Sequence, residues 1–452
     1  MLLIPHQATT TSTEIWFAER RTTQPPPRVR LSVFGAGTDA ELVLPATWDV
    51  LPTLDKPTFV GRVKMGGLKP NTRYLFRAKQ DEAGAAYGAA ARIRTMPLTL
   101  PTSQEPPLVI GLSSCFYLAR DRTGQAGSIT RRAPADLLPH VKFLCGDQVY
   151  LDLPVQQDLP SNPQHLFSAL FDKYWLNWTQ GGDDITTGFG SYLRWGANLF
   201  VSDDHEWWNN YPFATAIASN TWTSAGRKQW RASAQALFGA FQTFNGEPKL
   251  GEITVGTPGH PGSVEIRSID GRIFRTKDIS HNPKQLRAIT GWLGRLKGPG
   301  ILVLSQPIFE RSVGWLQQNF KDAGIVDLDD FPELAEALYY APHDVLILSG
   351  DIHAARMSRT SGWRSRMVEL VSSPLSLCQG HTHQPQPAST RFPPRAVAGT
   401  SPTAVKSTTP LLENHSLVLE IVQIQGGFRA TPTYWPTDPT HKPVKLDAID
   451  FF

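Results

Sequence analysis

Five stretches of the chain are continuous runs of apolar residues that end abruptly in polar side chains. They span residues 108–115, 141–150, 198–206, 301–306 and 345–353. An apolar run without alternation is typical of a β-strand that is covered on both faces, as in the parallel sheets of α/β proteins. We therefore expect five buried strands, each of which delivers a polar end to a common sheet edge.

The polar residues at these strand ends are the candidate chemical groups, because ligands of open α/β sheets bind in the crevice at the carboxyl ends of the strands. The residues expected there are Cys115, Asp147, Tyr150, Asp203, Asp204, His205, Gln306, Asp351 and His353. Carboxylates gathered in a partly dry crevice repel one another and are costly to ionise unless cations neutralise them. The pattern therefore predicts bound metal ions.

The first part of the chain has a different pattern. Short strands with Gly, Pro and Asn turns follow one another over residues 13–96 without a helical period, which predicts a β-sandwich. Residues 66–78 resemble the tyrosine-corner region of fibronectin type III domains, with Tyr74 as the corner residue. We expect a fibronectin- or immunoglobulin-like accessory domain over residues 1–97 and a proline-rich linker over residues 98–107.

Helical patterns alternate with the buried strands in the remainder of the chain. Apolar residues recur at helical spacing in residues 163–178, 227–244, 285–296 and 333–340. Further strands are expected within residues 246–278, including 271–276, and a closing hairpin and tail follow at the end of the chain. This alternation predicts an α/β domain over residues 108–452.

Composition narrows the picture. A length of 452 residues exceeds the usual size of one hydrophobic core, and a net charge of +4 suits an anionic substrate without favouring nucleic acid. Three cysteines are too few for a disulfide framework. Because no stretch approaches the ~18 apolar residues of a membrane helix and no signal peptide is seen, we expect a cytoplasmic protein. A periplasmic or secreted location is the alternative if an export signal has been removed, and the oligomeric state stays open.

With the strand ends in view, the chain resembles the PhoD-like branch of the metallophosphoesterases, a family of alkaline phosphatases and phosphodiesterases related to purple acid phosphatases. The matching motifs, in the family's order, are SSC at 113–115, GDQVY at 146–150, DDHEWWNN at 203–210, DGRIFR at 270–275, SQPIF at 305–309 and GDIH at 350–353. The resemblance implies a four-layer α/β/β/α sandwich behind a small β domain. It also implies hydrolysis of phosphate esters by a metal-activated hydroxide.

The resemblance further implies a cluster of Fe³⁺ with one or two Ca²⁺ ions. Its metal ligands map onto Cys115, Asp147, Tyr150, Asp204, Asp351 and His353, with Asp147 bridging. Thiolate and phenolate ligands suit iron, whereas carboxylates suit calcium, and Zn²⁺ or Mn²⁺ is the alternative. From the residues alone, Asp203 and Asp204 could exchange roles. Cys115 could also be an inert buried thiol and Tyr150 a packed aromatic ring.

The catalytic candidates are His205, Asp204, Arg272 and Arg356. His205 stands next to a metal ligand and is expected to donate a proton or hydrogen bond to the phosphoryl oxygen or the leaving group. Arg272 and Arg356 are candidates for a phosphate clamp, with structural ion pairs as the alternative. Asp270 is expected either at the cluster or in a turn. Glu206, Asn209 and Asn210 are expected to brace loops, and His381 and His383 to be solvated.

Three functions are consistent with these residues. The first is a phosphomonoesterase, a phosphodiesterase or both, acting on a small phosphate ester. The second is a dedicated phosphodiesterase or phospholipase-D-like enzyme, because ester preference depends on the walls of the crevice rather than on the metal ligands. The third is a non-catalytic scaffold that binds a polyanion. The last predicts lost ligands, whereas the chain keeps every ligand type that catalysis requires.

Overall fold

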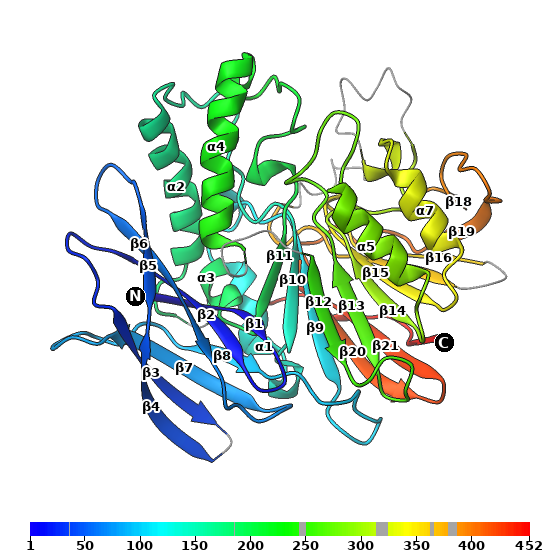
Figure 1. Cartoon of the computed structure of the whole chain (residues 1–452), viewed down its shortest axis with the longest axis horizontal. Coiled ribbons are helices and arrows are strands. Elements are labelled where there is room, and N and C mark those ends of the chain that lie inside the picture. The colour runs from blue at the N-terminus through cyan, green and yellow to red at the C-terminus, as the bar shows by residue number, and fades with distance from the viewer. Residues whose placement is uncertain (36, 185, 244–249, 313–323, 362–365, 378–386) are drawn as a thin grey trace.

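The N-terminal part of the chain is a sandwich of two antiparallel sheets (Figure 1). In this computed structural model, the described residues are 1–35, 37–184, 186–243, 250–312, 324–361, 366–377 and 387–452, so that His381 and His383 lie outside them. One sheet has the order β1 (Leu2–Ala8), β2 (Thr13–Arg20), β6 (Thr58–Met65) and β5 (Thr47–Leu51). The other has the order β4 (Thr38–Pro45), β3 (Arg28–Gly35), β7 (Arg73–Gln80) and β8 (Ala91–Arg94).

Side chains from both of these sheets form one buried cluster, which includes Phe17 and Val63 from the first sheet and Leu31 and Phe76 from the second. The pattern of short strands and turns predicted the sandwich from residue 13 onwards but missed β1, which pairs antiparallel with β2. The sequence of β1 contains a proline and shows no alternation, so that nothing local marks it as a strand.

The rest of the chain forms two larger sheets. The seven-stranded sheet has the order β11 (Asn198–Val201), β10 (Val141–Cys145), β9 (Leu108–Ser113), β20 (His415–Ile424), β21 (Gly427–Pro436) and β22 (Val444–Lys445), with β23 (Ile449–Phe451) also on β21. The eight-stranded sheet has the order β12 (Gly251–Val255), β13 (Val264–Ser268), β14 (Gly300–Val303), β15 (Val345–Ser349), β17 (Met367–Val371), β16 (Arg356–Thr360), β19 (Thr403–Ser407) and β18 (Arg391–Phe392).

The five predicted buried strands are β9, β10, β11, β14 and β15, and they are parallel to their predicted neighbours within each sheet. They do not share one sheet edge, however, because β9 to β11 belong to the first sheet and β14 and β15 to the second. The expected strand at residues 271–276 is also absent: this segment is a turn that follows β13. The predicted closing hairpin is formed by β20 and β21, and β20 pairs antiparallel with β9.

Three hydrophobic clusters hold these layers together. Side chains such as Ile110 and Phe143 from one sheet and Val303 and Leu346 from the other fill the space between the two sheets. Helices α5 (Pro283–Leu293) and α7 (Phe331–Tyr339) pack on the outer face of the eight-stranded sheet. Helices α2 (Pro163–Thr179), α3 (Gly188–Leu193) and α4 (Ser224–Phe241) pack over the seven-stranded sheet. The mixed α/β fold expected from the sequence is therefore confirmed.

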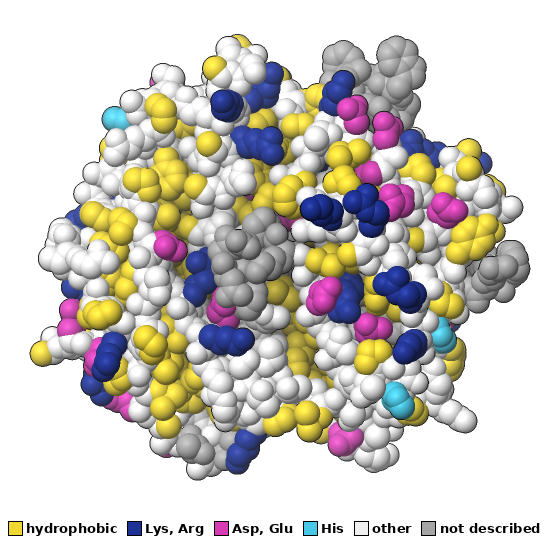
Figure 2. Space-filling model, in the orientation of Figure 1, with side chains coloured by type: hydrophobic (Ala, Val, Ile, Leu, Met, Phe, Trp, Pro, Cys, Tyr) yellow, Lys and Arg dark blue, Asp and Glu magenta, His cyan; other side chains and the backbone are white. Residues whose placement is uncertain are grey.

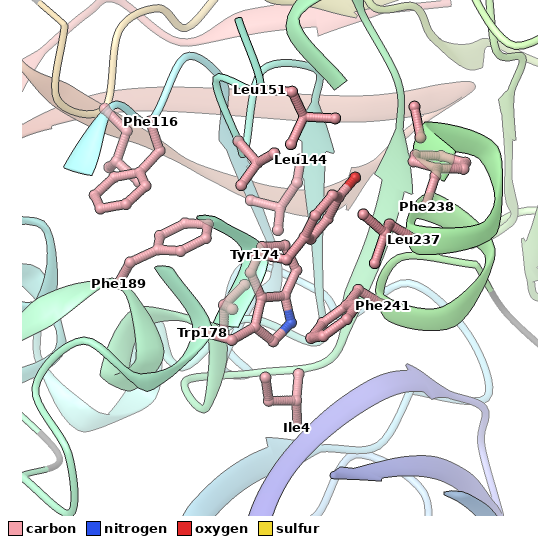
Figure 3. Packing of buried hydrophobic residues seen from close by; sticks show 14 of the residues in the cluster. Ile4, Phe116, Leu144, Leu151, Tyr174, Trp178, Phe189, Leu237, Phe238 and Phe241 are labelled. Carbon is pink, nitrogen blue, oxygen red and sulfur yellow. The ribbon is translucent and has the colours of Figure 1, made fainter. Parts of the chain in front are cut away.

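The helices that cover the seven-stranded sheet meet in an aromatic cluster. Tyr174 and Trp178 of α2 lie against Phe241 of α4, with ring centroids 5.0 and 5.5 Å apart respectively (Figure 3). Helix α2 begins at an Asn-Pro pair, in which Asn162 accepts hydrogen bonds from the backbone N–H groups of Gln164 and His165. The cap and the buried aromatic face together explain why this segment is helical.

The sandwich is joined to the α/β part at the end of α4. The indole Nε1 of Trp16 donates to the carbonyl of Ala240 at 2.7 Å, and the guanidinium of Arg62 donates to the carbonyls of Gly239 and Ala240 at 3.0 and 2.9 Å. These carbonyls belong to the last turn of the helix, where carbonyl groups have no N–H partner within the helix. The sandwich therefore completes the C-terminus of α4.

The molecular surface mixes charges of both signs. Figure 2 shows basic, acidic and apolar side chains interspersed over the face that it displays, without one large patch of a single sign. Among the described residues, no helix has the length and apolarity that a membrane crossing requires.

Candidate metal centre

Four of the predicted ligands sit in strained turns directly after buried strands. Cys115, Asp147, Asp351 and His353 have φ angles of 58°, 59°, 74° and 52°. Side chains with a Cβ atom rarely adopt positive φ, and such strain clusters at functional sites. Of the seven non-glycine residues with positive φ in the described part of the chain, four are thus predicted ligands.

Two glycines allow these turns to approach each other. A Cβ atom on Gly146, whose φ is +85°, would lie 2.3 Å from the Cβ of Asp203. A Cβ atom on Gly350 would lie 2.5 Å from the Cβ of Ser114 and 2.6 Å from the carbonyl oxygen of Cys145. The GD pairs therefore bring the turns after β9, β10, β11 and β15 into direct contact, although these strands lie in two sheets.

The first group of donor atoms contains a thiol, a carboxylate, a phenol and an imidazole. The Sγ of Cys115 and the hydroxyl of Tyr150 lie 3.4 and 3.2 Å from Oδ2 of Asp147. The Nε2 of His353 lies 3.4 Å from the same hydroxyl. Ligand atoms of Cys115, Asp147 and His353 all lie within 4.8 Å of one another, close enough to hold one metal ion.

The second group shares Asp147 with the first. Ligand atoms of Asp147, Asp204 and His205 again lie within 4.8 Å of one another. The carboxylate of Asp204 accepts a hydrogen bond from the backbone N–H of Asn210 at 2.8 Å. Asp147 consequently lies where a residue that bridges two ions would have to be.

Asp203 and Asp204, which could not be told apart from the sequence, face different partners. Asp203 forms an ion pair with Nε of Arg272, and both side chains are fully buried. Arg272 also donates from Nη1 to the carbonyl of Tyr211 at 3.1 Å. Arg356 is likewise buried and donates to Glu310 at 2.7 Å, with Glu369 at 3.7 Å. Both arginines thus occupy ion pairs with carboxylates.

Asp351 lies beside Cys115 but belongs to neither group of close ligand atoms. Its Oδ2 accepts a hydrogen bond from Nε2 of Gln306 at 3.1 Å, and its backbone carbonyl accepts one from the thiol of Cys115 at 3.6 Å. Gln306, in the segment that follows β14, is in turn held by Nη1 of Arg275 at 3.2 Å. Asp270 is in a turn, where its carboxylate accepts hydrogen bonds from the backbone N–H groups of Ser202 and Arg272.

Glu206 braces the two turns that carry the shared ligand. Its carboxylate accepts hydrogen bonds from the backbone N–H groups of Asp147, Gln148 and Asp203 at 2.8, 2.6 and 2.9 Å. Burial raises the pKa of this carboxyl to about 7, against the opposing effect of the three N–H groups. A single side chain therefore ties the turn after β10 to the turn after β11.

Asp152 lies at the candidate metal centre, although the sequence pattern did not predict it there. Its Oδ1 lies 2.7 Å from Nδ1 of His205, and its Oδ2 accepts a hydrogen bond from the backbone N–H of Asn209 at 2.6 Å. Burial opposes protonation of His205, but the charges of Asp152, Asp204 and Asp147 outweigh it and raise the pKa of the imidazole well above its usual range. The one signal in the sequence was an acidic residue two positions after Tyr150.

The electrostatics of the centre favour bound cations. Burial, with the charge of Asp147 next, raises the pKa values of Cys115 and Tyr150 well above their usual range. Burial also raises the pKa of Asp147, and the charges of Asp204 and Asp203 add to the effect. Positive charge between these groups would reverse each of these shifts, and the mixture of sulfur, phenol, imidazole and carboxylate donors fits metal ions.

An apolar cavity of about 430 Å³ opens beside the centre. Tyr150 forms part of its wall, together with Tyr117, Val149, Leu153 and Leu176. The ring of Tyr117 lies 5.4 Å from that of Tyr150, centroid to centroid. The cavity could therefore receive an apolar group of a molecule that is bound at the centre.

The fold of this chain is thus two packed sheets between helical layers, with the candidate ligand side chains at the strand ends. The solved structure titled "Structure of PhoD" shares it, with a TM-score of 0.63 and 13% sequence identity over 99% of this chain and 88% of that chain. Purple acid phosphatase PPD1 from seeds of yellow lupin (Lupinus luteus) matches with a TM-score of 0.61 and 10% identity over 99% of this chain and 73% of its own. The resemblance to the PhoD-like branch is thus confirmed at the level of the fold. No protein-family model matches the sequence, and no curated protein matches it either.

Proposed function

We propose that this protein is a metal-dependent hydrolase of phosphate esters, acting on monoesters, diesters or both. The observation that carries the proposal is the convergence of Cys115, Asp147, Tyr150, Asp204 and His353 from two sheets into one buried cluster of ligand atoms. The shared fold with phosphatases supports the same conclusion.

The donor chemistry divides the ligands between two kinds of ion. Cys115, Asp147 and Tyr150 would hold Fe³⁺, because thiolate and phenolate prefer a strongly polarising cation. Asp204 and the oxygens of Asp351 would suit Ca²⁺, with Asp147 shared and His353 beside the phenol. When bound, such ions would supply Lewis acidity toward a phosphoryl oxygen and would lower the pKa of a coordinated water.

His205 is the group that we assign to proton donation. Asp152 holds Nδ1, which leaves Nε2 as the ring atom that can give a proton or a hydrogen bond to the leaving oxygen. Arg272 and Arg356 are not included in the phosphate clamp, because each is engaged with a buried carboxylate. We propose that these two arginines position loops instead.

The test combines metal analysis with turnover. Protein purified without added metal should contain iron and calcium, should absorb visible light through tyrosinate-to-iron charge transfer, and should hydrolyse p-nitrophenyl phosphate or its bis ester. Asp147→Asn should lose metal and activity together, whereas Asp278→Asn, at a position outside the centre, should keep both. Fully metal-loaded protein that turns over neither ester would overturn the proposal. A colourless, active zinc or manganese protein would overturn the iron assignment alone.

A dedicated phosphodiesterase is the second candidate, and the apolar cavity favours it. A diester carries a second organic group, which the cavity beside Tyr150 could bind. Leu176→Asn should then lower kcat/KM for the bis ester by about fivefold and leave that for the monoester unchanged. The control is Leu98→Asn, since Leu98 is also exposed but does not line the cavity.

We also propose that residues 1–97 form a fibronectin-like accessory domain, followed by the linker at 98–107 and the catalytic domain at 108–452. The hydroxyl of Tyr74 accepts a hydrogen bond from the backbone N–H of Lys69 at 2.9 Å, as a tyrosine corner requires.

A purely polyanion-binding scaffold would need none of the metal ligands. Asp147→Asn would keep its affinity for a polyanion, which makes that third reading separable from catalysis.

A further inference from the structure

The outer face of the sheet β4-β3-β7-β8 carries a row of arginines. Arg73 of β7 lies directly opposite Arg94 of β8, and Leu75 lies opposite Arg92, so that these side chains share one face of the sheet. Residues between them, such as Tyr74, point into the core of the sandwich. Like charges on directly opposed residues destabilise a sheet. This pair therefore costs stability unless negative charge lies nearby.

Burial and the charge of Arg73 lower the pKa of Arg94, and the charge of Asp136 offsets only part of this effect. In the described part of the chain, Arg73, Arg92 and Arg131 form no ion pair with an acidic side chain, in contrast to Arg30 of the same sheet, which pairs with Glu41 and Asp81. Arg92 donates to the carbonyl of Thr130 at 3.4 Å. The three guanidinium groups therefore keep most of their capacity to bind an anion.

Arg73, Arg92 and Arg131 line one cavity of about 610 Å³. It lies between the sandwich and the α/β part of the chain, and its walls also include Phe34, Leu75 and Trp195. None of these residues belongs to the metal centre or to the apolar cavity beside Tyr150. The cavity is thus a second concave site, and its charged side chains are all basic.

The cavity is held in shape by the backbone. The N–H of Arg92 donates to the carbonyl of Arg194 at 2.8 Å, and the N–H of Gly196 donates to the carbonyl of Arg92 at 2.8 Å. Arg94 is fixed by Oδ1 of Asn71 at 2.9 Å and by the carbonyl of Asp136 at 3.1 Å. Burial lowers the pKa of Arg92 and lowers that of Arg94 to about 10, so that the structure holds partly desolvated cations in place.

We propose that this cavity binds an anionic ligand that carries at least two phosphate or sulfate groups. A guanidinium forms paired hydrogen bonds with the oxygens of such groups, and three guanidiniums around one cavity match a ligand with several of them. The proposal does not depend on the proposed enzymatic function, because it uses no residue of the metal centre.

The test uses inositol hexasulfate, a polyanion that a phosphoesterase does not hydrolyse, and titrates it into the full-length protein by calorimetry. We expect saturable binding with one site per chain and an affinity that falls as NaCl is added. Arg73→Gln and Arg92→Gln should each weaken binding about tenfold, because each removes charge-assisted hydrogen bonds. Arg359→Gln, an exposed arginine on β16, is the matched control and should bind as the wild type does.

Tripolyphosphate in a parallel titration distinguishes recognition of phosphate from recognition of sulfate. For either anion, a lower affinity in Arg73→Gln and Arg92→Gln supports the proposed site. Turnover of p-nitrophenyl phosphate should be the same in all of these variants. The thermal unfolding temperature of Arg73→Gln should be equal to or above that of the wild type, since a like-charge contact is removed. Absence of saturable binding, or binding that neither substitution weakens, would overturn the proposal.

Discussion

Oδ1 of Asp152 lies 2.7 Å from Nδ1 of His205, which joins the segment after β10 to the segment after β11, and both side chains are shielded from solvent. The contact fixes which ring nitrogen of His205 faces the protein and which remains for chemistry. It also favours the protonated imidazole, because the carboxylate charge stabilises the cation.

Replacing Asp152 by Asn tests this relationship. The variant keeps a polar partner at Nδ1 but removes the negative charge, so the pKa of His205 should fall. If His205 acts as a proton donor, the alkaline limb of the activity profile should move to lower pH and kcat should drop by about 10- to 100-fold. Metal content, measured by elemental analysis, should stay at the wild-type level. An unchanged pH profile would mean that Asp152 is needed for packing alone.

Glu206 offers a test of the bracing of the two turns. Glu206→Gln places an amide NH₂ group where backbone N–H groups now find a carboxylate oxygen, so at least one buried donor loses its partner. We expect a loss of roughly 2 kcal/mol in the free energy of unfolding and a lower metal content. Urea denaturation and elemental analysis measure the two effects. Glu336→Gln, at an exposed position on α7, should change neither.

Gly146 tests the close approach of the turns. Gly146→Ala adds a Cβ atom that meets the Cβ of Asp203 at 2.3 Å, on a backbone with a φ of +85°. Gly67→Ala has a similar φ of +78° but meets nothing within 4 Å, so it isolates the cost of the backbone conformation. We expect a loss of about 1 kcal/mol for Gly67→Ala and clearly more for Gly146→Ala, together with weaker metal binding. Equal losses would show that the turn can move away.

His6 predicts a specific acid sensitivity. Burial, aided by the charge of Arg62, lowers the pKa of this imidazole from 6.5 to about 3. The unfolded chain takes up a proton near pH 6.5 and the folded chain does not, so this contribution to stability is complete above pH 6.5 and is lost as the pH falls toward 3. At pH 4 the loss amounts to about 3 kcal/mol.

His6→Gln should therefore flatten the decline of the unfolding free energy between pH 7 and pH 4, as followed by urea denaturation. His441→Gln changes an imidazole that is half exposed, and it should leave the slope as it is in the wild type. A slope that His6→Gln does not alter would contradict a buried neutral imidazole.

The sequence pattern predicted the strands that are buried on both faces. Strands such as β10 and β15 are buried on both faces, so their apolar runs and the polar residues that end them can be read locally. Strand β1 was not predicted, because its pairing with β2 depends on tertiary contacts rather than on a local pattern. The division of the five strands between two sheets was not predicted either, because strand order depends on residues far apart in the chain.

The predicted site residues differ in how far local information could place them. Residues at the strand ends could be singled out because each apolar run stops at a recognisable position, and the ends of strands from both sheets then meet in the centre. The partners of Asp203, Asp204 and Asp152 depend on the path of the loops, and this path depends on Glu206 and on the turn at Gly146. Arg272 and Arg356 illustrate the limit, since an arginine in a motif gives no sign of which carboxylate it will meet.

Trp16 and Arg62, which take up the last carbonyls of α4, have a consequence for any shortened form of this protein. Helix α4 contributes Gln242, just beyond its end, to the hydrogen bonds around Gln148 and Tyr174, beneath the turn that carries Asp147. A fragment that starts at residue 108 would keep every candidate metal ligand, yet the carbonyls of Gly239 and Ala240 would lose the donors Trp16 and Arg62. The N-terminal sandwich therefore supports the end of α4 and, through Gln242, the packing beneath the turn at Asp147.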